Sequence, residues 1–211
     1  MSSRIDHLVI TAPDLGTGAA LVRRALGAAM QTGGEHVRLG THNLLLKLGE
    51  SLFLEVIAVN PQAPRPERKR WFGLDGLPPE APPRLATWVA RTDDIRAAAA
   101  ACAEELGTIE PMTRGRLRWL ITIPEDGSLV LGGTAPALIQ WQAEPHPAAG
   151  LPGAGCSLVR LELFHPEPAR VSALLRSLSL EEPIPVVGPL PAGSRPHLVA
   201  HIQAPGGVKV L

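Results

Sequence analysis

One pattern of residues occurs twice in the chain, and this repeat constrains the fold more than any other feature. Asp14 precedes an amphipathic segment that ends at Leu26-Gly27, and Asp94 precedes a second such segment that ends at Leu106-Gly107. An aspartate is a preferred helix N-cap, and a glycine is a common residue just after a helix end. Because both anchors recur at one spacing, the chain contains an internal duplication.

The first copy reads as a strand, a helix and three further strands. Residues 5–11 predict a strand, with Ile5, His7 and Val9 on one face and Leu8 and Ile10 on the other. The glycine pair Gly33-Gly34 predicts a turn after the helix. The remaining strands are predicted at residues 35–39, 44–48 and 52–59, with turns at Asn43 and at Gly49-Glu50.

The second copy predicts the same order of elements as the first, and the tail predicts a shorter form of it. Residues 84–91 predict a strand, residues 94–107 a helix, and further strands are expected at 117–123, 128–131 and 137–142. From Ser157 a shorter segment reads as strand, helix and a closing hairpin over residues 205–207. This tail is either half of another unit or a cap of independent origin.

The predicted organisation is one compact domain with four parts. The first βαβββ module covers residues 1–60, a linker covers 61–83, the second module covers 84–143, and a C-terminal partial module or cap covers 156–211. The linker is rich in proline and arginine, and the apolar pair Trp71-Phe72 is expected to anchor it.

Composition excludes several classes of function. The formal net charge is +0, which gives no electrostatic reason to expect nucleic acid or an anionic membrane surface as a partner. The 2 cysteines, Cys102 and Cys156, form neither a zinc ribbon nor a CxxC redox pair. No signal peptide or membrane-spanning apolar run is evident, so a cytoplasmic protein is expected. The 22 prolines and the preference for arginine over lysine suggest a GC-rich bacterial genome.

Three stretches resemble the glyoxalase-like branch of the vicinal-oxygen-chelate superfamily: IDHLVI, GGEHVRLGTHN and LFLEVIAV. The run from Gly33 to Asn43 is the most specific of them. The resemblance implies an α+β fold in which paired βαβββ modules form curved mixed sheets around a central cup. It also implies a small-molecule ligand, and self-association to a homodimer is common in this fold.

The resemblance further implies how a metal ion would be held. In metal-using members a divalent ion such as Zn, Mn, Ni or Fe sits in the cup, with ligands from the first and last strand of each module. Carried onto this sequence, the first module offers His7 and Glu55. The repeat places Thr87 opposite His7 and Gln140 opposite Glu55, and threonine is a poor ligand. The predicted metal ligands are therefore His7, Glu55 and Gln140.

Glu55 is the residue whose position most favours a functional site. It lies in the apolar run of residues 52–57, where a carboxylate is costly to bury unless it is paired, hydrogen-bonded or bound to a metal. We therefore predict Glu55 and His7 as the catalytic residues. The alternatives are an acid paired with an arginine or with His7 itself, and a histidine satisfied at a strand end.

Other polar and aromatic residues are candidates for substrate binding. The resemblance places His36 and Asn43 beside the pocket, whereas His42 reads as a hairpin residue and His146, between two prolines, as a loop residue. Stacking on a ligand is predicted for four aromatic residues, for which core packing is the alternative: Trp71, Phe72, Trp88 and Trp141.

Two functions remain open from the sequence. The first is a lyase, isomerase or hydrolase that acts on a small oxygenated metabolite, with or without a divalent metal. The second is a metal-free cup that sequesters a small molecule, as resistance proteins of this fold do. The chain has 0 tyrosines, which argues against a ring-cleaving dioxygenase, and it lacks a GxSxG elbow and a phosphate-binding loop.

Overall fold

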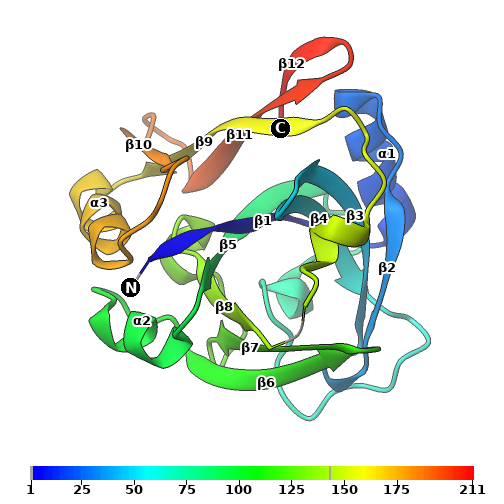
Figure 1. The fold of residues 1–211 in the computed structure, drawn as a ribbon, viewed down its shortest axis with the longest axis horizontal. Coiled ribbons are helices and arrows are strands. Elements are labelled where there is room, and N and C mark those ends of the chain that lie inside the picture. The colour runs from blue at the N-terminus through cyan, green and yellow to red at the C-terminus, as the bar shows by residue number, and fades with distance from the viewer. Residues whose placement is uncertain (1, 143) are drawn as a thin grey trace.

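The computed structural model describes residues 2–142 and 144–211 and contains two β-sheets in contact (Figure 1). An eight-stranded sheet curls around a central cup, and a four-stranded sheet covers part of its outer face. Residues 1 and 143, the first residue of the first predicted module and the last residue of the second, lie outside the described residues. The strands of the large sheet are β1 (Ser3–Thr11), β2 (Gln31–His36), β3 (Thr41–Gly49), β4 (Leu52–Val59), β5 (Arg84–Thr92), β6 (Thr108–Arg114), β7 (Leu117–Ile123) and β8 (Ala137–Trp141).

The two halves of the large sheet have the same topology. The strand order is β2-β3-β4-β1 in the first half and, in mirror order, β5-β8-β7-β6 in the second. In each half the first strand pairs in parallel with the last, and β1 pairs antiparallel with β5 to join the halves. The predicted α+β fold of paired βαβββ modules around a cup is confirmed.

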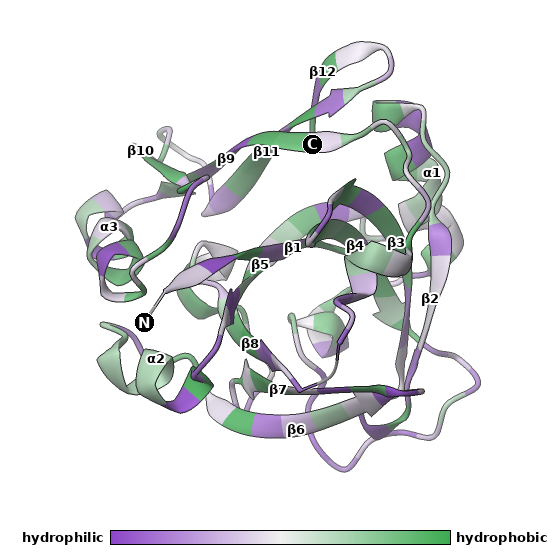
Figure 2. Cartoon of the chain, viewed as in Figure 1, coloured by the Kyte–Doolittle hydropathy of each residue, from purple (hydrophilic) through white to green (hydrophobic). Residues whose placement is uncertain are grey.

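Both repeat anchors act as helix N-caps. The Asp14 carboxylate accepts a hydrogen bond from the Thr17 amide at the start of α1 (Leu15–Leu26), and Asp94 does the same for Ala97 in α2 (Ile95–Ala101). Gly27 ends α1 with φ 68, a left-handed conformation that a glycine adopts without strain. The helix α1 carries both hydrophobic and hydrophilic residues (Figure 2), and its buried side packs on β3 and β4.

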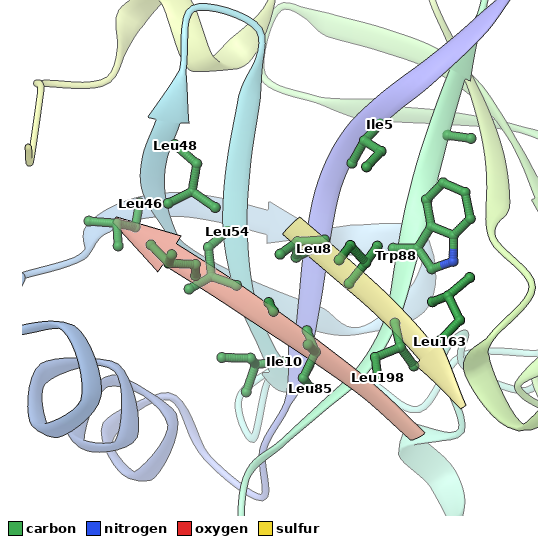
Figure 3. Close-up of a cluster of buried hydrophobic side chains, with 14 of the residues drawn as sticks. Ile5, Leu8, Ile10, Leu46, Leu48, Leu54, Leu85, Trp88, Leu163 and Leu198 are labelled. Atoms are coloured by element: carbon green, nitrogen blue, oxygen red, sulfur yellow. The ribbon is translucent and has the colours of Figure 1, made fainter. Parts of the chain in front are cut away.

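The main hydrophobic core lies between the two sheets. Leu8 and Ile10 of β1, Trp88 of β5 and Leu54 of β4 point outward from the cup and are fully buried (Figure 3). The small sheet supplies the facing residues, among them Leu163 of β9 (Ser157–His165). A second cluster fills much of the cup on the opposite face of the large sheet.

The C-terminal sheet does not repeat the topology of the modules. Its order is β10-β9-β11-β12, so the first strand β9 pairs with the next strand, β10 (Val186–Pro189), in parallel rather than with the last strand. The helix α3 (Pro168–Ser177) connects these two strands, and β11 (His197–Ala204) with β12 (Gly207–Val210) closes the sheet. The tail is therefore a covering layer with its own topology and not half of a third module.

The segment that precedes β3 differs from its prediction. Gly33-Gly34 does not form a turn but lies within β2, at an irregularity in the pairing of β2 with β3. The chain reverses later, through a 3₁₀ turn at Val37–Leu39 that ends at Gly40 with φ 57. Asn43 consequently lies within a strand, which directs its side chain into the cup.

The second module also differs from its prediction in two places. The strand β6 was not predicted, because Pro111 interrupts its pattern, yet a proline is tolerated on the edge strand that β6 is. Residues 128–131 form no strand, and a 3₁₀ helix covers Val130–Gly133 instead. The helix α2 ends at Ala101, since the residues that follow are tied to α3 by a hydrogen bond from the Ala103 amide to Ser177.

Polar contacts connect the two edges of the curled sheet. Arg38, in the turn after β2, donates hydrogen bonds to the Glu110 carboxylate and to the Pro111 carbonyl on β6. Arg114 at the end of β6 donates to the Asn43 side chain on β3. These contacts hold β2 and β6 near each other and so close the cup along its open side.

Within residues 2–142 and 144–211, none of the helices has the length and apolar character that crossing a bilayer would require.

The contact between the two sheets predicts a stability difference along one strand. Leu163 is fully buried and faces the large sheet, whereas Val159 of the same strand is 52 % exposed. Leu163→Ala is expected to lower the free energy of unfolding by about 2–5 kcal/mol, because it leaves a cavity in the core. The matched control Val159→Ala is expected to change it by less than about 0.5 kcal/mol. Urea denaturation followed by circular dichroism measures both, and equal effects would contradict this placement of the core.

Candidate functional site

A cavity inside the cup collects polar residues of the first module and aromatic residues of both modules. Its volume is about 20 Å³, which is enough for one water-sized sphere. The residues that line it are His7, His36, Asn43, Phe53, Glu55, Trp71, Phe72, Arg114, Trp119, Ile121, Ile139 and Trp141. A ligand larger than water must therefore displace some of these side chains.

A β-bulge in β1 shapes the polar end of the cavity. The register with β5 shifts between Ile5 and His7, so Asp6 is an extra residue in the strand. As a consequence Ile5 packs in the outer core with Leu8, and not on the face of His7 and Val9 as predicted. The bulge brings the Asp6 carboxylate to 2.6 Å from Nδ1 of His7.

Asp6 is a fully buried carboxylate with several donors. His146 Nε2 lies at 2.9 Å and Trp141 Nε1 at 2.9 Å from the Asp6 oxygen that does not face His7. Arg91 Nε lies 3.9 Å from that same oxygen. Burial by itself raises the pKa of Asp6, but the hydrogen bonds and charges of His146 and His7 outweigh it and hold that pKa well below its usual range.

The hydrogen bonds around Asp6 determine the protonation of both histidines. His146 Nδ1 accepts a hydrogen bond from the Ala148 amide, so the ring proton of His146 is on Nε2 and points to Asp6. An ionised carboxylate is only an acceptor, so His7 must donate from Nδ1. The remaining nitrogen of His7, Nε2, lies 3.6 Å from Oε2 of Glu55. His7 thus presents its second ring nitrogen, which is not bonded to Asp6, to the glutamate.

A second chain of hydrogen bonds holds Glu55 from its other side. Asn43 Nδ2 donates to Glu55 Oε1, and Arg114 donates to the Asn43 oxygen at 3.0 Å. Burial lowers the pKa of Arg114, and the negative charge of Glu55 opposes this. This chain of hydrogen bonds therefore connects the Arg114 guanidinium to the Glu55 carboxylate inside the cup.

The glycine pair of β2 makes room for this second chain. A Cβ on Gly33 would lie 2.1 Å from the Asn43 oxygen, and a Cβ on Gly34 would lie 3.0 Å from the Arg114 side chain. Gly34 also has φ 143, which side chains disfavour. The run from Gly33 to Asn43 is the most specific part of the family resemblance. Its two glycines leave room for the side chains of Asn43 and Arg114.

His36 is a neutral member of the site. Burial, and then the positive charge of Arg114, lower the pKa of His36 to about 3. Its Nδ1 lies 3.1 Å from the Thr41 hydroxyl, and its ring packs edge-on against Trp71. A neutral imidazole can position a ligand but carries no charge at neutral pH.

The structure brings together seven of the nine predicted site residues: His7, His36, Asn43, Glu55, Trp71, Phe72 and Trp141. Trp88 is not among them, and its prediction as a stacking residue is wrong. It points to the outer core, where its indole N–H donates to the Thr134 carbonyl (Figure 3).

Gln140 is also placed away from the cavity, so its prediction as a metal ligand is wrong. Its side chain caps the start of α2, where it accepts from the Ile95 amide and donates to the Asp93 carbonyl. The strand registers identify the residue that corresponds to Glu55 in the second half. Val9 pairs with Glu55 in the first half and Val89 pairs with Ala137 in the second, so the counterpart of Glu55 is Ala137.

The donor set of the cavity does not fit a divalent metal ion. The second module offers only Thr87 and Ala137 at the positions of His7 and Glu55, and the Thr87 hydroxyl already donates to backbone carbonyls. Among the residues described, no three of the types His, Cys, Asp and Glu are grouped to hold a metal. The Arg114 charge beside Glu55 also opposes a second cation. Two protein ligands are fewer than such a site needs.

Sequence reasoning missed five polar or aromatic residues in or next to the site: Asp6, Phe53, Arg114, Trp119 and His146. Asp6 was hidden by the bulge, and Arg114 by the unpredicted strand β6. His146 lies in a loop as predicted, but it is buried on Asp6. The signal available for Asp6 was a second polar residue next to His7 within an otherwise apolar strand.

Comparison with known proteins establishes the family. The sequence model of the Glyoxalase-like domain family matches residues 5–179, and the protein therefore belongs to that family. The resemblance to the vicinal-oxygen-chelate superfamily is thereby confirmed. No curated protein matches the sequence.

Solved structures with the same fold are distant in sequence. A hypothetical protein from Staphylococcus aureus is 14 % identical, with a TM-score of 0.56 over 84 % of this chain and 75 % of that chain. A methylmalonyl-CoA epimerase from Streptomyces coelicolor, in complex with 2-nitronate-propionyl-CoA, is 21 % identical with a TM-score of 0.43, covering 66 % and 98 % of the two chains. The epimerase from Mycobacterium tuberculosis is 18 % identical with a TM-score of 0.41, covering 69 % and 91 %. Likeness at this level concerns the fold alone.

The buried Asp6 predicts a pH-dependent loss of stability. Asp6→Asn is expected to lower the free energy of unfolding by about 3–5 kcal/mol at pH 7, because it removes the partner of buried donors. The folded-state pKa of Asp6 is lowered, so its contribution is complete above the unfolded pKa of about 3.9 and is lost as pH falls toward the folded pKa. The difference between wild type and variant should therefore narrow below about pH 4.

Urea unfolding at pH 7, 5, 4 and 3 measures this difference. Glu80→Gln is the control, because Glu80 is an exposed carboxylate. A difference for Asp6→Asn that stays constant down to pH 3 would contradict the ionised, hydrogen-bonded state of Asp6.

Proposed function

We propose that this protein is a metal-independent enzyme that moves a proton on a small oxygenated metabolite, with Glu55 as the general base. The observation that carries the proposal is that His7 Nε2 and Glu55 Oε2 lie 3.6 Å apart on one cavity, while Asp6 fixes the other nitrogen of His7. A base with an oriented acid partner is the arrangement that proton transfer needs.

The chemistry follows from the charges around Glu55. The Glu55 carboxylate accepts a proton from the carbon beside a substrate carbonyl, and the electron pair of that C–H bond moves onto the carbonyl oxygen. The resulting enolate oxygen is stabilised by the positive charge of the Arg114 guanidinium. Return of the proton to another carbon of a conjugated enolate completes an isomerisation. Loss of a leaving group from the enolate completes a lyase reaction, and Glu55 then gives its proton to water.

The aromatic lining of the cavity supports a second candidate function. Trp71, Trp119 and Trp141 lie beside the polar group, and such rings bind small ligands tightly without catalysis. In that case the protein would sequester a metabolite, and Glu55 would serve only as a hydrogen-bond acceptor for it.

Deuterium exchange distinguishes the two functions. Wild-type protein in D₂O is incubated with a panel of small 2-oxo acids, hydroxyketones and acyl thioesters, and ¹H NMR follows loss of the proton beside the carbonyl. The enzyme proposal expects exchange that persists in the presence of a chelator and falls by at least about 100-fold in Glu55→Gln.

Glu50→Gln serves as the matched control, since Glu50 has an exposed side chain at the end of β3 and should keep full exchange. Exchange that is lost with chelator and restored by a divalent ion would contradict the metal-free proposal. Binding of a panel member without exchange would favour the sequestering function.

A further inference from the structure

A surface pocket lies beside the buried Asp6, separate from the cavity that Glu55 lines. Its volume is about 280 Å³, compared with about 20 Å³ for the cavity inside the cup. Trp141 lines both spaces, and Arg4 and Arg91 form part of the pocket wall. The pocket is therefore large enough for a small organic molecule, whereas the cavity holds one water-sized sphere.

Two arginines in this pocket lie opposite each other on neighbouring strands. Arg4 of β1 is paired directly with Arg91 of β5, and the two strands run side by side (Figure 1). Their neighbours Ile5 and Ala90 pack in the outer core, so both arginines extend from the inner face of the sheet. Like charges at directly opposed positions repel each other and destabilise a sheet. An anionic group between the two guanidiniums would remove this cost.

The carboxylates of the protein itself leave the arginine pair incompletely satisfied. An oxygen of Asp6 lies 3.9 Å from Nε of Arg91, and an oxygen of Glu181 lies 3.8 Å from Nε of Arg4. Both distances exceed that of a hydrogen bond, and neither guanidinium donates one to any other residue that the structure describes. The Asp6 oxygen already accepts from an indole and an imidazole. Because the Arg91 side chain is only 16 % exposed, bulk water reaches little of it.

Two carboxylates line the same pocket without pairing with these arginines. Asp93 and Glu144 are exposed, and neither forms an ion pair with a cation in the described part of the chain. The pocket thus holds positive and negative groups that do not neutralise each other. A ligand with a single charge would be attracted by one kind of group and repelled by the other. A ligand that carries both charges, held apart, would complement both.

We propose that this pocket binds a small zwitterion of the amino acid type, with its carboxylate between Arg4 and Arg91 and its ammonium group toward Asp93 and Glu144. A guanidinium binds a carboxylate through paired hydrogen bonds, which no described residue provides to Arg91. The site is independent of proton transfer at Glu55, because the pocket and the cavity have only Trp141 in common.

A titration followed by ¹H–¹⁵N NMR tests the pocket with small probes of known charge. Glycine, β-alanine and 4-aminobutanoate carry both charges at different separations, whereas propanoate and propylamine carry one charge each. The best zwitterion should bind at least about tenfold more tightly than either single-charge probe, and it should shift the amide signals of Arg91 and Asp93. Equal affinity for propanoate and the best zwitterion, or no saturable shift at these amides, overturns the proposal.

Variants of the pocket locate the two charges of the probe. Arg91→Gln should weaken binding of the best zwitterion at least about tenfold, because it removes one guanidinium from the carboxylate. Arg4→Gln should weaken it as well, and its half-exposed position keeps the test valid if the first variant folds poorly. Asp93→Asn should weaken the zwitterion but not propanoate. Arg24→Gln, on the exposed side of α1, is the control and should bind as wild type does. Binding that survives both arginine variants overturns the proposal.

The outcome is separate from that of the acid–base proposal. Glu55→Gln should keep the affinity for the best zwitterion, since Glu55 does not line the pocket. A loss of affinity in this variant would place the probe in the cup and overturn the pocket site. Deuterium exchange in the same variant reports on catalysis alone, so either proposal can fail without the other.

Discussion

The buried carboxylate of Asp6 is the interaction on which the site depends. An ionised group with no exposed surface is tolerated only when donors surround it, and here two imidazoles and one indole do so. These donors come from β1 itself, from the end of β8 and from the loop that follows β8. One side chain therefore holds the two halves of the cup and the covering loop in a fixed relation.

Fixing His7 through Asp6 has a chemical consequence. Because Nδ1 of His7 donates to Asp6, the free nitrogen Nε2 is the atom that faces Glu55. The same fold would support metal chemistry if the second half supplied ligands, but Thr87 and Ala137 occupy those positions. Duplication has thus left the pair of imidazole and carboxylate in one half only.

Much of the fold was predictable because it depends on local patterns. The helix caps at Asp14 and Asp94, the alternation in β1 and the apolar run of β4 are all visible in the sequence, and together they predict the duplicated architecture. Glu55 was predictable as a site residue for the same reason, since an acid within an apolar strand has few explanations.

The rest of the site depends on features that leave no local pattern. A bulge shifts the strand by a single residue, so Asp6 and Ile5 exchange faces without any change in composition. The two halves also differ in the length between their first and last strands, so the repeat alone does not identify Ala137 as the counterpart of Glu55. Arg114 reaches Asn43 only because the sheet curls until its edges meet.

The protonation of His7 tests this account most directly. ¹⁵N NMR of the imidazole, recorded across a pH titration, separates the two ring nitrogens. The account predicts that the neutral His7 ring carries its proton on Nδ1, and that Asp6→Asn abolishes this preference. A His7 ring that is neutral with its proton on Nε2 would contradict it, because Asp6 would then not be orienting the histidine toward Glu55.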